Sequence, residues 1–168
     1  MKSYANRGKA FEKLIVLSNK YYAQKRWAAV EKVEPSFKTI GFYRKYAYGY
    51  YEGPGFVDFV GVANGRSICF EAKSTNERTR FPLKNMNEKQ YELLKDWDIQ
   101  GSISFVLIEF EKRQVVFLLK FNQLRKWWED AQNGGRKSIP FEWFHFNCQR
   151  VMNNRGIPLD YLDALNIQ

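Results

Sequence analysis

An Asn64-Gly65 dipeptide stands between two largely apolar runs, FVDFVGV (56–62) and RSICFEAK (66–73). Asn-Gly is favoured in two-residue β-hairpin turns, because both positions of such a turn require a positive φ. The sequence therefore predicts two antiparallel strands, over residues 56–62 and 66–73. The turn also fixes their register, since the two residues that flank it must pair with each other.

This register brings three charged side chains together. Counting outward from the turn places Val60 opposite Cys69 and Asp58 opposite Glu71. Directly opposed residues have Cβ atoms roughly 5 Å apart. Lys73 lies two residues after Glu71 and shares its face of the strand. The opposite face is expected to be wholly apolar, with Val57, Phe59, Ile68, Phe70 and Ala72.

Two opposed carboxylates inside an apolar hairpin repel each other, so one must hold a proton or both must share a cation. Carboxylate and carbonyl oxygens are the ligands that Mg²⁺ prefers, so Asp58 and Glu71 are candidate metal ligands. Lys73 would then orient or deprotonate a water, or stabilise charge on a phosphate. The alternative is a Glu71–Lys73 ion pair on a solvated edge strand, with Asp58 near a strand end.

Composition narrows the chemistry and the partners. The 168 residues include 27 Lys and Arg against 18 Asp and Glu, a net charge of +9, which favours nucleic acid as partner over an anionic membrane surface. One histidine (His145) and two cysteines without CxxC spacing disfavour a zinc site and Ser-His or Cys-His catalysis. No apolar stretch approaches the roughly 18 residues of a membrane span, and no signal peptide is recognisable, so we expect a soluble cytoplasmic protein.

Hydrophobic periodicity and turn residues predict a single α/β domain around a mixed sheet. Residues 36–55 mix glycines, basic residues and tyrosines without a core face, and are expected to form a protruding two-stranded arm that 53–55 close. Besides the hairpin strands, the expected elements are helices over 4–22, 87–97 (with Asn87 as N-cap), 121–131 and 158–165, and strands over 26–33, 102–110 and 114–120.

Several short segments together resemble one nuclease family. They are NRGKAFE (6–12), VDFVGV and FEAK within 57–73, TRFPLKN (79–85), Gln90, GRKSI (135–139) and LDYL (159–162). From about Asn6 to Leu162 the chain resembles the PD-(D/E)xK nuclease superfamily and, within it, the RecU-type Holliday-junction resolvases of Gram-positive bacteria and their phages. This resemblance implies a restriction-endonuclease-like core of order α-β-β-β-α-β, with the acidic residues on a central hairpin.

The resemblance also implies roles for single residues. Asp58 and Glu71 match the metal-binding acids, and Lys73 matches the catalytic lysine. Gln90 and Glu12 match residues that support the metal site. The alternative for Gln90 is an ordinary amphipathic helix, and the alternative for Glu12 is a solvated helix residue. The family often has a hydroxyl residue where this chain has Val57.

The implied activity is Mg²⁺-dependent hydrolysis of DNA strands at four-way (Holliday) junctions in recombination and repair, with Mn²⁺ able to replace Mg²⁺. Water activated by the metal would attack the phosphate in line and leave a 5′-phosphate and a 3′-hydroxyl. The family also implies a homodimer, a stalk at the junction centre and recombination proteins as further partners.

Basic residues and rings supply the DNA contacts expected of such an enzyme. The rivals are a superfamily nuclease that cuts ordinary duplex DNA and a non-catalytic junction-binding protein; an RNA-binding module lacks a matching motif. Tyrosines of the arm have the alternative of packing on each other, and GRKSI that of a simple surface turn. The candidate DNA-binding residues are Arg7, Arg44, Lys45, Tyr46, Arg80, Lys84, Arg136 and Lys137.

Overall fold

The computed structural model describes residues 4–34, 36–51 and 56–167, apart from the side chains of residues 4–7 and 51. The expected closure of the arm at 53–55 lies outside the described residues. The elements are α1 (Tyr4–Gln24), β1 (Ala28–Lys32), β2 (Phe37–Tyr43), β3 (Tyr46–Tyr51), β4 (Phe59–Ala63), β5 (Arg66–Thr75), β6 (Arg80–Pro82), η1 (Leu83–Asn85), α2 (Glu88–Ile99), β7 (Ile103–Phe110), η2 (Glu111–Arg113), β8 (Val115–Lys120), α3 (Phe121–Gln132), β9 (Ser138–Pro140), α4 (Phe141–Asn147), β10 (Gln149–Val151) and α5 (Tyr161–Ala164).

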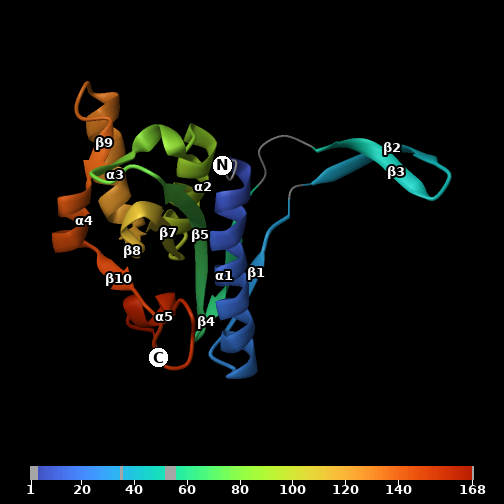
Figure 1. Cartoon of the computed structure of the whole chain (residues 1–168), viewed down its shortest axis with the longest axis horizontal. Helices are drawn as coiled ribbons and strands as arrows, with labels where there is room; N and C mark the ends of the chain where they lie inside the picture. Colours follow the sequence, from blue (N-terminus) through green and yellow to red (C-terminus); the bar gives the residue numbers. More distant parts are fainter. Residues whose placement is uncertain (1–3, 35, 52–55, 168) are drawn as a thin grey trace.

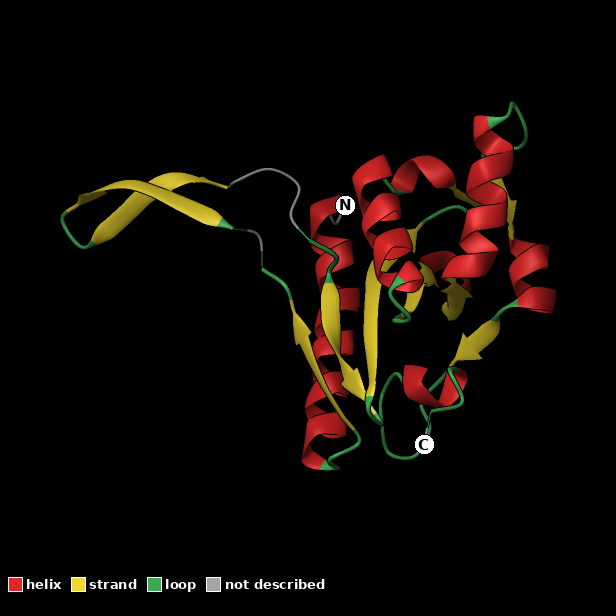
Figure 2. Ribbon diagram, turned by 180° about the vertical axis from the view of Figure 1, so that it is seen from behind, coloured by secondary structure: helices red, strands yellow, loops and turns green. Residues whose placement is uncertain are grey.

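A mixed sheet with helices on both sides forms the body of the molecule (Figures 1 and 2). Its strand order is β1-β4-β5-β7-β8-β10, in which β5 and β7 run parallel and the other neighbours run antiparallel. The succession α1, β1, β4, β5, α2, β7 reproduces the expected α-β-β-β-α-β core. The predicted α/β fold with a mixed sheet is therefore confirmed.

Each face of this sheet has its own apolar core. Alternate residues of β5 separate the two: Ile68 and Phe70 pack with Phe11 and Ile15 of α1, whereas Cys69 packs in the core formed with α2, α3 and α4. β5 is a central strand of the sheet, and the two apolar cores cover its two faces. Glu71, in the middle of β5, is therefore buried in the protein, whereas Arg66 at the start of the strand is exposed.

Hydrogen bonds of the buried Asp160 and Tyr161 side chains hold the segment around α5 against α1. The Asp160 carboxylate accepts a hydrogen bond from the Tyr22 hydroxyl (2.9 Å) and two from the Arg155 guanidinium (2.7 and 2.8 Å). The Tyr161 hydroxyl donates to Asn19 of α1 at 2.6 Å. The bonds from Tyr22 to Asp160 and from Tyr161 to Asn19 link positions about 140 residues apart and hold the LDYL segment against α1.

The turn predicted for the central hairpin is confirmed, and so is its register as far as Phe59 and Phe70. The expected pairs of Asp58 with Glu71 and of Phe56 with Lys73 lie beyond the ladder. Asn64 and Gly65 have φ values of 47° and 73°, as a two-residue turn requires. The strands pair from Ala63 with Arg66 to Phe59 with Phe70. The predicted start of the first strand at residue 56 is wrong, because residues 56–58 bend and β4 begins at Phe59.

The bend changes the direction of one side chain. Val57 was expected on the face of Phe59, but it packs in the other core, with Cys69 and Val60. The prediction for Val57 is therefore wrong, since strict alternation holds only where the backbone stays extended. The bend also leaves Asp58 just outside the regular strand, next to the end of the β4–β5 ladder.

Six short elements were not predicted, namely β6, η1, η2, β9, α4 and β10. The segment 74–85, expected to be a polar loop, contains β6, and the segment after α3 contains β9, α4 and β10. β6 and β9 pair with each other, Phe81 lying opposite Ile139, so the FPL and GRKSI segments form one two-stranded sheet. The short helix expected at 158–165 is confirmed as the single turn α5.

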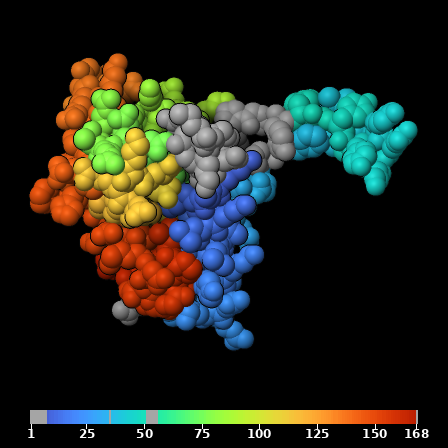
Figure 3. Space-filling model, in the orientation of Figure 1, coloured from blue at the N-terminus to red at the C-terminus, as the bar shows by residue number. Residues whose placement is uncertain are grey.

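The predicted arm forms an antiparallel hairpin of β2 and β3, called the stalk below. It stands clear of the body of the molecule (Figure 3). Within the part of the chain that the structure describes, no helix combines the length and the apolar character that a membrane crossing needs.

Candidate active site

The β4–β5 hairpin brings Asp58, Glu71 and Lys73 together near the carboxyl end of β5. Glu71 follows the last paired residue of the hairpin, Phe70, and its side chain is fully buried. β5 continues beyond the hairpin in parallel pairing with β7, which places Val106 beside Glu71 and Ile108 beside Lys73. At the acid and the lysine, the backbone of β5 is thus held by β7 on one side and by the hydrogen bond from the Ala72 amide to Asp58 on the other.

The two oxygens of Glu71 have different environments. Oε2 accepts a hydrogen bond from the Lys73 ammonium and another from the side-chain nitrogen of Gln90, each 2.7 Å long. Oε1 is buried and has no hydrogen-bond partner. A buried acceptor without a partner is costly in an ordinary core and is therefore expected at sites that bind something.

Burial raises the pKa of Glu71 to about 8. The Lys73 ammonium lowers the pKa, and the neighbouring Asp58 carboxylate raises it. Without a bound cation, the protein thus disfavours the ionised form of Glu71. A cation bound between the two carboxylates would replace the proton and remove their repulsion.

Asp58 is fixed by backbone hydrogen bonds on both sides. Its Oδ2 accepts a hydrogen bond from the Ala72 amide (2.9 Å), and its main-chain carbonyl accepts one from the Val33 amide (2.9 Å). The half-exposed Asp58 carboxylate lies beside the buried Glu71 carboxylate and stands closer to solvent. One carboxylate at the surface and one behind it form a site that is open on one side.

These residues fit a hard divalent cation. In proteins Mg²⁺ is often held by only one or two carboxylates, and water and substrate phosphate complete its shell. In the described part of the chain, no group of three or more Asp, Glu, His or Cys side chains gathers that could enclose an ion. The two carboxylates and the free Glu71 Oε1 suit a cation that shares its ligands with a substrate.

Gln90 is aimed at Glu71 by the start of α2. Asn87 is the N-cap, as predicted. Its side chain accepts a hydrogen bond from the backbone amide of Gln90 (2.9 Å), and the Gln90 side-chain oxygen accepts one from the backbone amide of Asn87 (3.2 Å). This capping box uses the oxygen of the Gln90 side chain and leaves the nitrogen to donate to Glu71. The helix terminus therefore orients a residue that contacts the site.

Glu12 lies elsewhere in the described structure. Its carboxylate forms an ion pair with Lys32 of β1 at 3.4 Å, both side chains being about 30% exposed. α1 covers the face of the sheet opposite to the one from which Gln90 reaches Glu71. The expectation that Glu12 supports the metal site stays a prediction.

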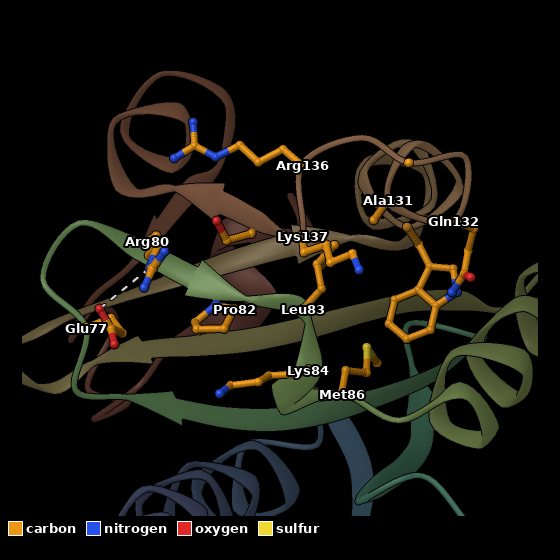
Figure 4. A pocket seen from close by; sticks show the side chains of 13 residues that line it. Glu77, Arg80, Pro82, Leu83, Lys84, Met86, Ala131, Gln132, Arg136 and Lys137 are labelled. Atoms are coloured by element: carbon orange, nitrogen blue, oxygen red, sulfur yellow. Dashed lines mark ion pairs between the residues drawn. The ribbon is translucent and has the colours of Figure 1, made fainter.

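Four of the candidate DNA-binding residues line one pocket of about 900 Å³ (Figure 4). Arg80 and Lys84 come from β6 and η1, and Arg136 and Lys137 come from the segment between α3 and β9. Pairing of β6 with β9 and a hydrogen bond from the Leu83 amide to the Lys137 carbonyl (3.1 Å) bring the two segments together. Sequence reasoning did not foresee that these four cations converge.

Three further candidates lie at the tip of the stalk. Arg44 and Lys45 form its turn and lie over the rings of Tyr43 and Tyr46, each 5.6 Å from the ring centre. Tyr46, Tyr48 and Tyr50 occupy alternate positions of β3 and share a face, and each is at least half exposed. The remaining candidate, Arg7, belongs to α1, but its side chain is outside the described residues.

A polar hollow of about 550 Å³ was not predicted at all. It begins at Ser74, directly after Lys73, and is also lined by Lys84 and by Lys112 of η2. The Ser74 hydroxyl donates to Glu109 at 2.6 Å, and the Arg113 guanidinium donates to the Arg78 carbonyl at 2.6 Å. No local pattern predicts this hollow, because β5, the segment 76–85 and η2 each supply part of its lining.

Known proteins resemble this chain over nearly its whole length. The model of the family RecU, Recombination protein U, matches residues 6–167. The "Holliday junction resolvase RecU" of Pediococcus pentosaceus is 32% identical over 97% of this chain and 84% of its own length. The protein of that name from Geobacillus sp. is 35% identical over 82% of this chain and 72% of its own.

A solved structure adds a likeness of shape only. The Archaeoglobus fulgidus protein Hjc, a Holliday junction resolvase, has a TM-score of 0.49 and 12% identity, over 82% of this chain and 91% of its own. The family assignment rests instead on the match to residues 6–167 and on relatives at 30–35% identity. This chain belongs to the RecU (Recombination protein U) family.

Proposed function

We propose that this protein is a divalent-metal-dependent endonuclease that resolves four-way DNA junctions by hydrolysing phosphodiester bonds. The observation that carries the proposal is Glu71, a fully buried carboxylate beside Asp58, with one oxygen held by Lys73 and Gln90 and the other without a partner. Relatives over most of the chain carry the name Holliday junction resolvase. A protein that only binds DNA has no need of such an acid.

Each residue of the site has a role in this proposal. Asp58 and Glu71 hold the cation, Mg²⁺ with Mn²⁺ as a substitute, which supplies positive charge to a water and to the phosphate when bound. Lys73 orients Glu71 and, at the edge of the site, stabilises negative charge on the phosphate or takes a proton from the attacking water. Gln90 keeps Glu71 in place, and Glu12 is retained as a supporting residue of α1.

The surroundings suit a branched polyanion. The basic pocket and the stalk tip offer cations to phosphates, and the tyrosines of β3 offer rings to exposed bases. We propose that the chain acts as a single nuclease domain whose stalk, at about 36–55, reaches the junction centre. Two copies in a homodimer would present two active sites to the two strands that must be cut, and recombination proteins are candidate further partners.

A nuclease that cuts ordinary duplex DNA would need the same chemistry. Only the choice of substrate therefore distinguishes a junction resolvase from a duplex nuclease. The test incubates the protein with a labelled four-way junction and with linear duplex of the same sequences, first with Mg²⁺ and then with EDTA. We expect cleavage of the junction alone, and only with Mg²⁺. Equal cleavage of both DNAs would favour the duplex nuclease. Tight junction binding without any cleavage would favour the non-catalytic binder.

A further inference from the structure

The large basic pocket has an apolar floor that a phosphate-binding surface does not need. Leu83 and Met86 are buried beneath it, and Trp128 and Ala131 of α3 border it. The ring of Trp128 is stacked on Tyr91 of α2, with ring centres 4.7 Å apart and planes within 8°. One side of the indole is thereby fixed, so the floor includes a rigid aromatic surface.

The rim of the pocket carries the positive charge. Figure 4 shows Arg80 and Lys84 on the β6–η1 segment, the Lys137 side chain pointing toward the α3 side of the pocket, and the Arg136 side chain extending away from Ala131. Arg80 forms an ion pair with Glu77 (3.7 Å). Cations around an apolar floor suit a ligand that is anionic at one end and flat and apolar at the other, which describes a nucleotide.

The pocket is continuous with the end of the catalytic strand. The polar hollow that begins at Ser74, next to Lys73, shares Glu77, Pro82 and Lys84 with the pocket. A strand whose phosphate lies at Glu71 and Lys73 can therefore follow a basic path, past Lys84, into the pocket. An intact duplex presents a convex backbone with its bases stacked inside, so it could touch the rim but could not fill the floor.

We propose that this pocket receives one unpaired nucleotide of branched DNA, with its base on the apolar floor and its phosphates on the basic rim. The inference rests on the proposed function, because it takes the DNA bound at the active site as its ligand. Flipping a base out of the stack costs least where the base is already unpaired. A pocket that binds such a base gives the enzyme a preference for branched DNA over duplex that its phosphate contacts cannot give.

Filling the pocket without changing its charge tests this directly. Ala131→Phe places a ring in the pocket, and Ala23→Phe makes the same substitution at an exposed position of α1 as the control. Binding is measured in EDTA, so that no DNA is cut, against a four-way junction and the matching linear duplex. We expect Ala131→Phe to weaken junction binding about tenfold and to leave duplex binding unchanged, and Ala23→Phe to change neither.

A second pair of variants serves if Ala131→Phe does not fold, as thermal unfolding would reveal. Arg136→Glu reverses a charge on the rim, and Arg66→Glu reverses one at the opposite end of β5. Arg136→Glu should weaken junction binding at least tenfold more than Arg66→Glu does. Equal losses of junction affinity in Arg136→Glu and Arg66→Glu would contradict the inference. Equal losses in Ala131→Phe and Ala23→Phe would contradict it as well.

Removing single bases from the DNA identifies the ligand. Junctions with one abasic residue at each of several positions around the branch keep every phosphate but lose one base. We expect that loss of the base at one position weakens binding of the wild-type protein about tenfold. The same abasic junction should weaken binding of Ala131→Phe or Arg136→Glu much less. If no position shows this coupling while the wild type still cleaves junctions, only the present inference fails. If the coupling appears but no junction is cleaved, only the proposed function fails.

Discussion

At the scale of single residues, the site depends on how Glu71 is held. Two donors, Lys73 and Gln90, occupy Oε2, so the carboxylate cannot rotate freely and Oε1 stays available. Asp58 is anchored to the Ala72 amide, which sets its distance from Glu71 through the backbone. The raised pKa of Glu71 results chiefly from its burial and, to a smaller extent, from the neighbouring Asp58 carboxylate, and a bound cation would relieve both.

Lys73→Ala should separate catalysis from DNA binding. The ammonium lies at the edge of the site, 15% exposed, and donates to Glu71. In the proposed mechanism it acts on the reacting groups more than on distant phosphates. Single-turnover cleavage of a junction should fall at least about 10³-fold, while affinity measured in EDTA should stay within about twofold. Lys95→Ala, which removes an exposed lysine of α2, is the control. Cleavage retained in Lys73→Ala would remove the assigned role.

Gln90→Glu should separate the capping role of this residue from its role at the site. Glutamate forms a capping box as glutamine does, so the stability of α2 should be kept. A carboxylate, however, cannot donate to Glu71 Oε2 and adds charge beside it. We expect thermal stability within a few degrees of the wild type and cleavage reduced about tenfold or more. Wild-type cleavage rates in Gln90→Glu would show that Gln90 only caps the helix.

At the scale of elements, the central hairpin shows what a sequence can predict. The Asn64-Gly65 turn determines the pairing of its neighbours by counting, and this pairing holds as far as Phe59 and Phe70. The direction of Val57 was missed because the bend at 56–58 arises from contacts outside the hairpin, such as the hydrogen bond from the Val33 amide to the Asp58 carbonyl. Local rules apply only where the backbone stays regular.

The pairing of β6 with β9 was not predictable from local patterns. Each strand has three residues, too few to show an alternation, and almost sixty residues separate them in the chain. Both segments were nevertheless predicted to contact DNA, because of their basic residues and the family resemblance. Sequence reasoning thus named four cations of the pocket, but only the fold shows that they face one another.

Asp160→Asn should destabilise the protein in a pH-dependent way. Burial alone would raise the pKa of Asp160, but hydrogen bonds from Arg155 and Tyr22 outweigh it and lower the pKa below its ordinary value of 3.8. The stabilisation by this carboxylate is therefore complete above that value and is lost as the pH falls through the lower, folded-state pKa. Near pH 7 the variant should lose roughly 3 kcal/mol, because an arginine is left without its buried partner.

Urea unfolding across this pH range measures the effect. The difference in unfolding free energy between the wild type and Asp160→Asn should shrink as the pH is lowered below about 4. Asp163→Asn is the control, since Asp163 is half exposed and its distance to the same Arg155 is 3.9 Å. A difference that stays constant from pH 7 to pH 3 would contradict the role assigned to the Asp160 carboxylate.

At the scale of the whole molecule, the proposed DNA contacts form two groups. The basic pocket belongs to the body, near β6 and β9, whereas the stalk extends away from the opposite side (Figures 1 and 2). A straight duplex of modest length can cover one group at a time, but arms that diverge from one point can reach both. The arrangement therefore favours branched over linear DNA.

Arg44→Ala combined with Lys45→Ala should weaken junction binding through the stalk tip alone. Removing two phosphate contacts should lower the affinity about tenfold and reduce the salt dependence of binding by about two units of slope. The double variant Lys13→Ala and Lys20→Ala removes two exposed charges of α1 and serves as the control. If both double variants lose the same affinity, the stalk contributes only general positive charge.

A plasmid that extrudes a cruciform tests the central claim most directly. Supercoiled plasmid with and without a long inverted repeat is incubated with the protein and Mg²⁺, and nicked and linear products are followed over time. Paired incision of two strands at one junction predicts that linear plasmid appears early, only with the inverted repeat, and not with Lys73→Ala. Equal cutting of both plasmids, or nicked circles without linear product, would contradict the account.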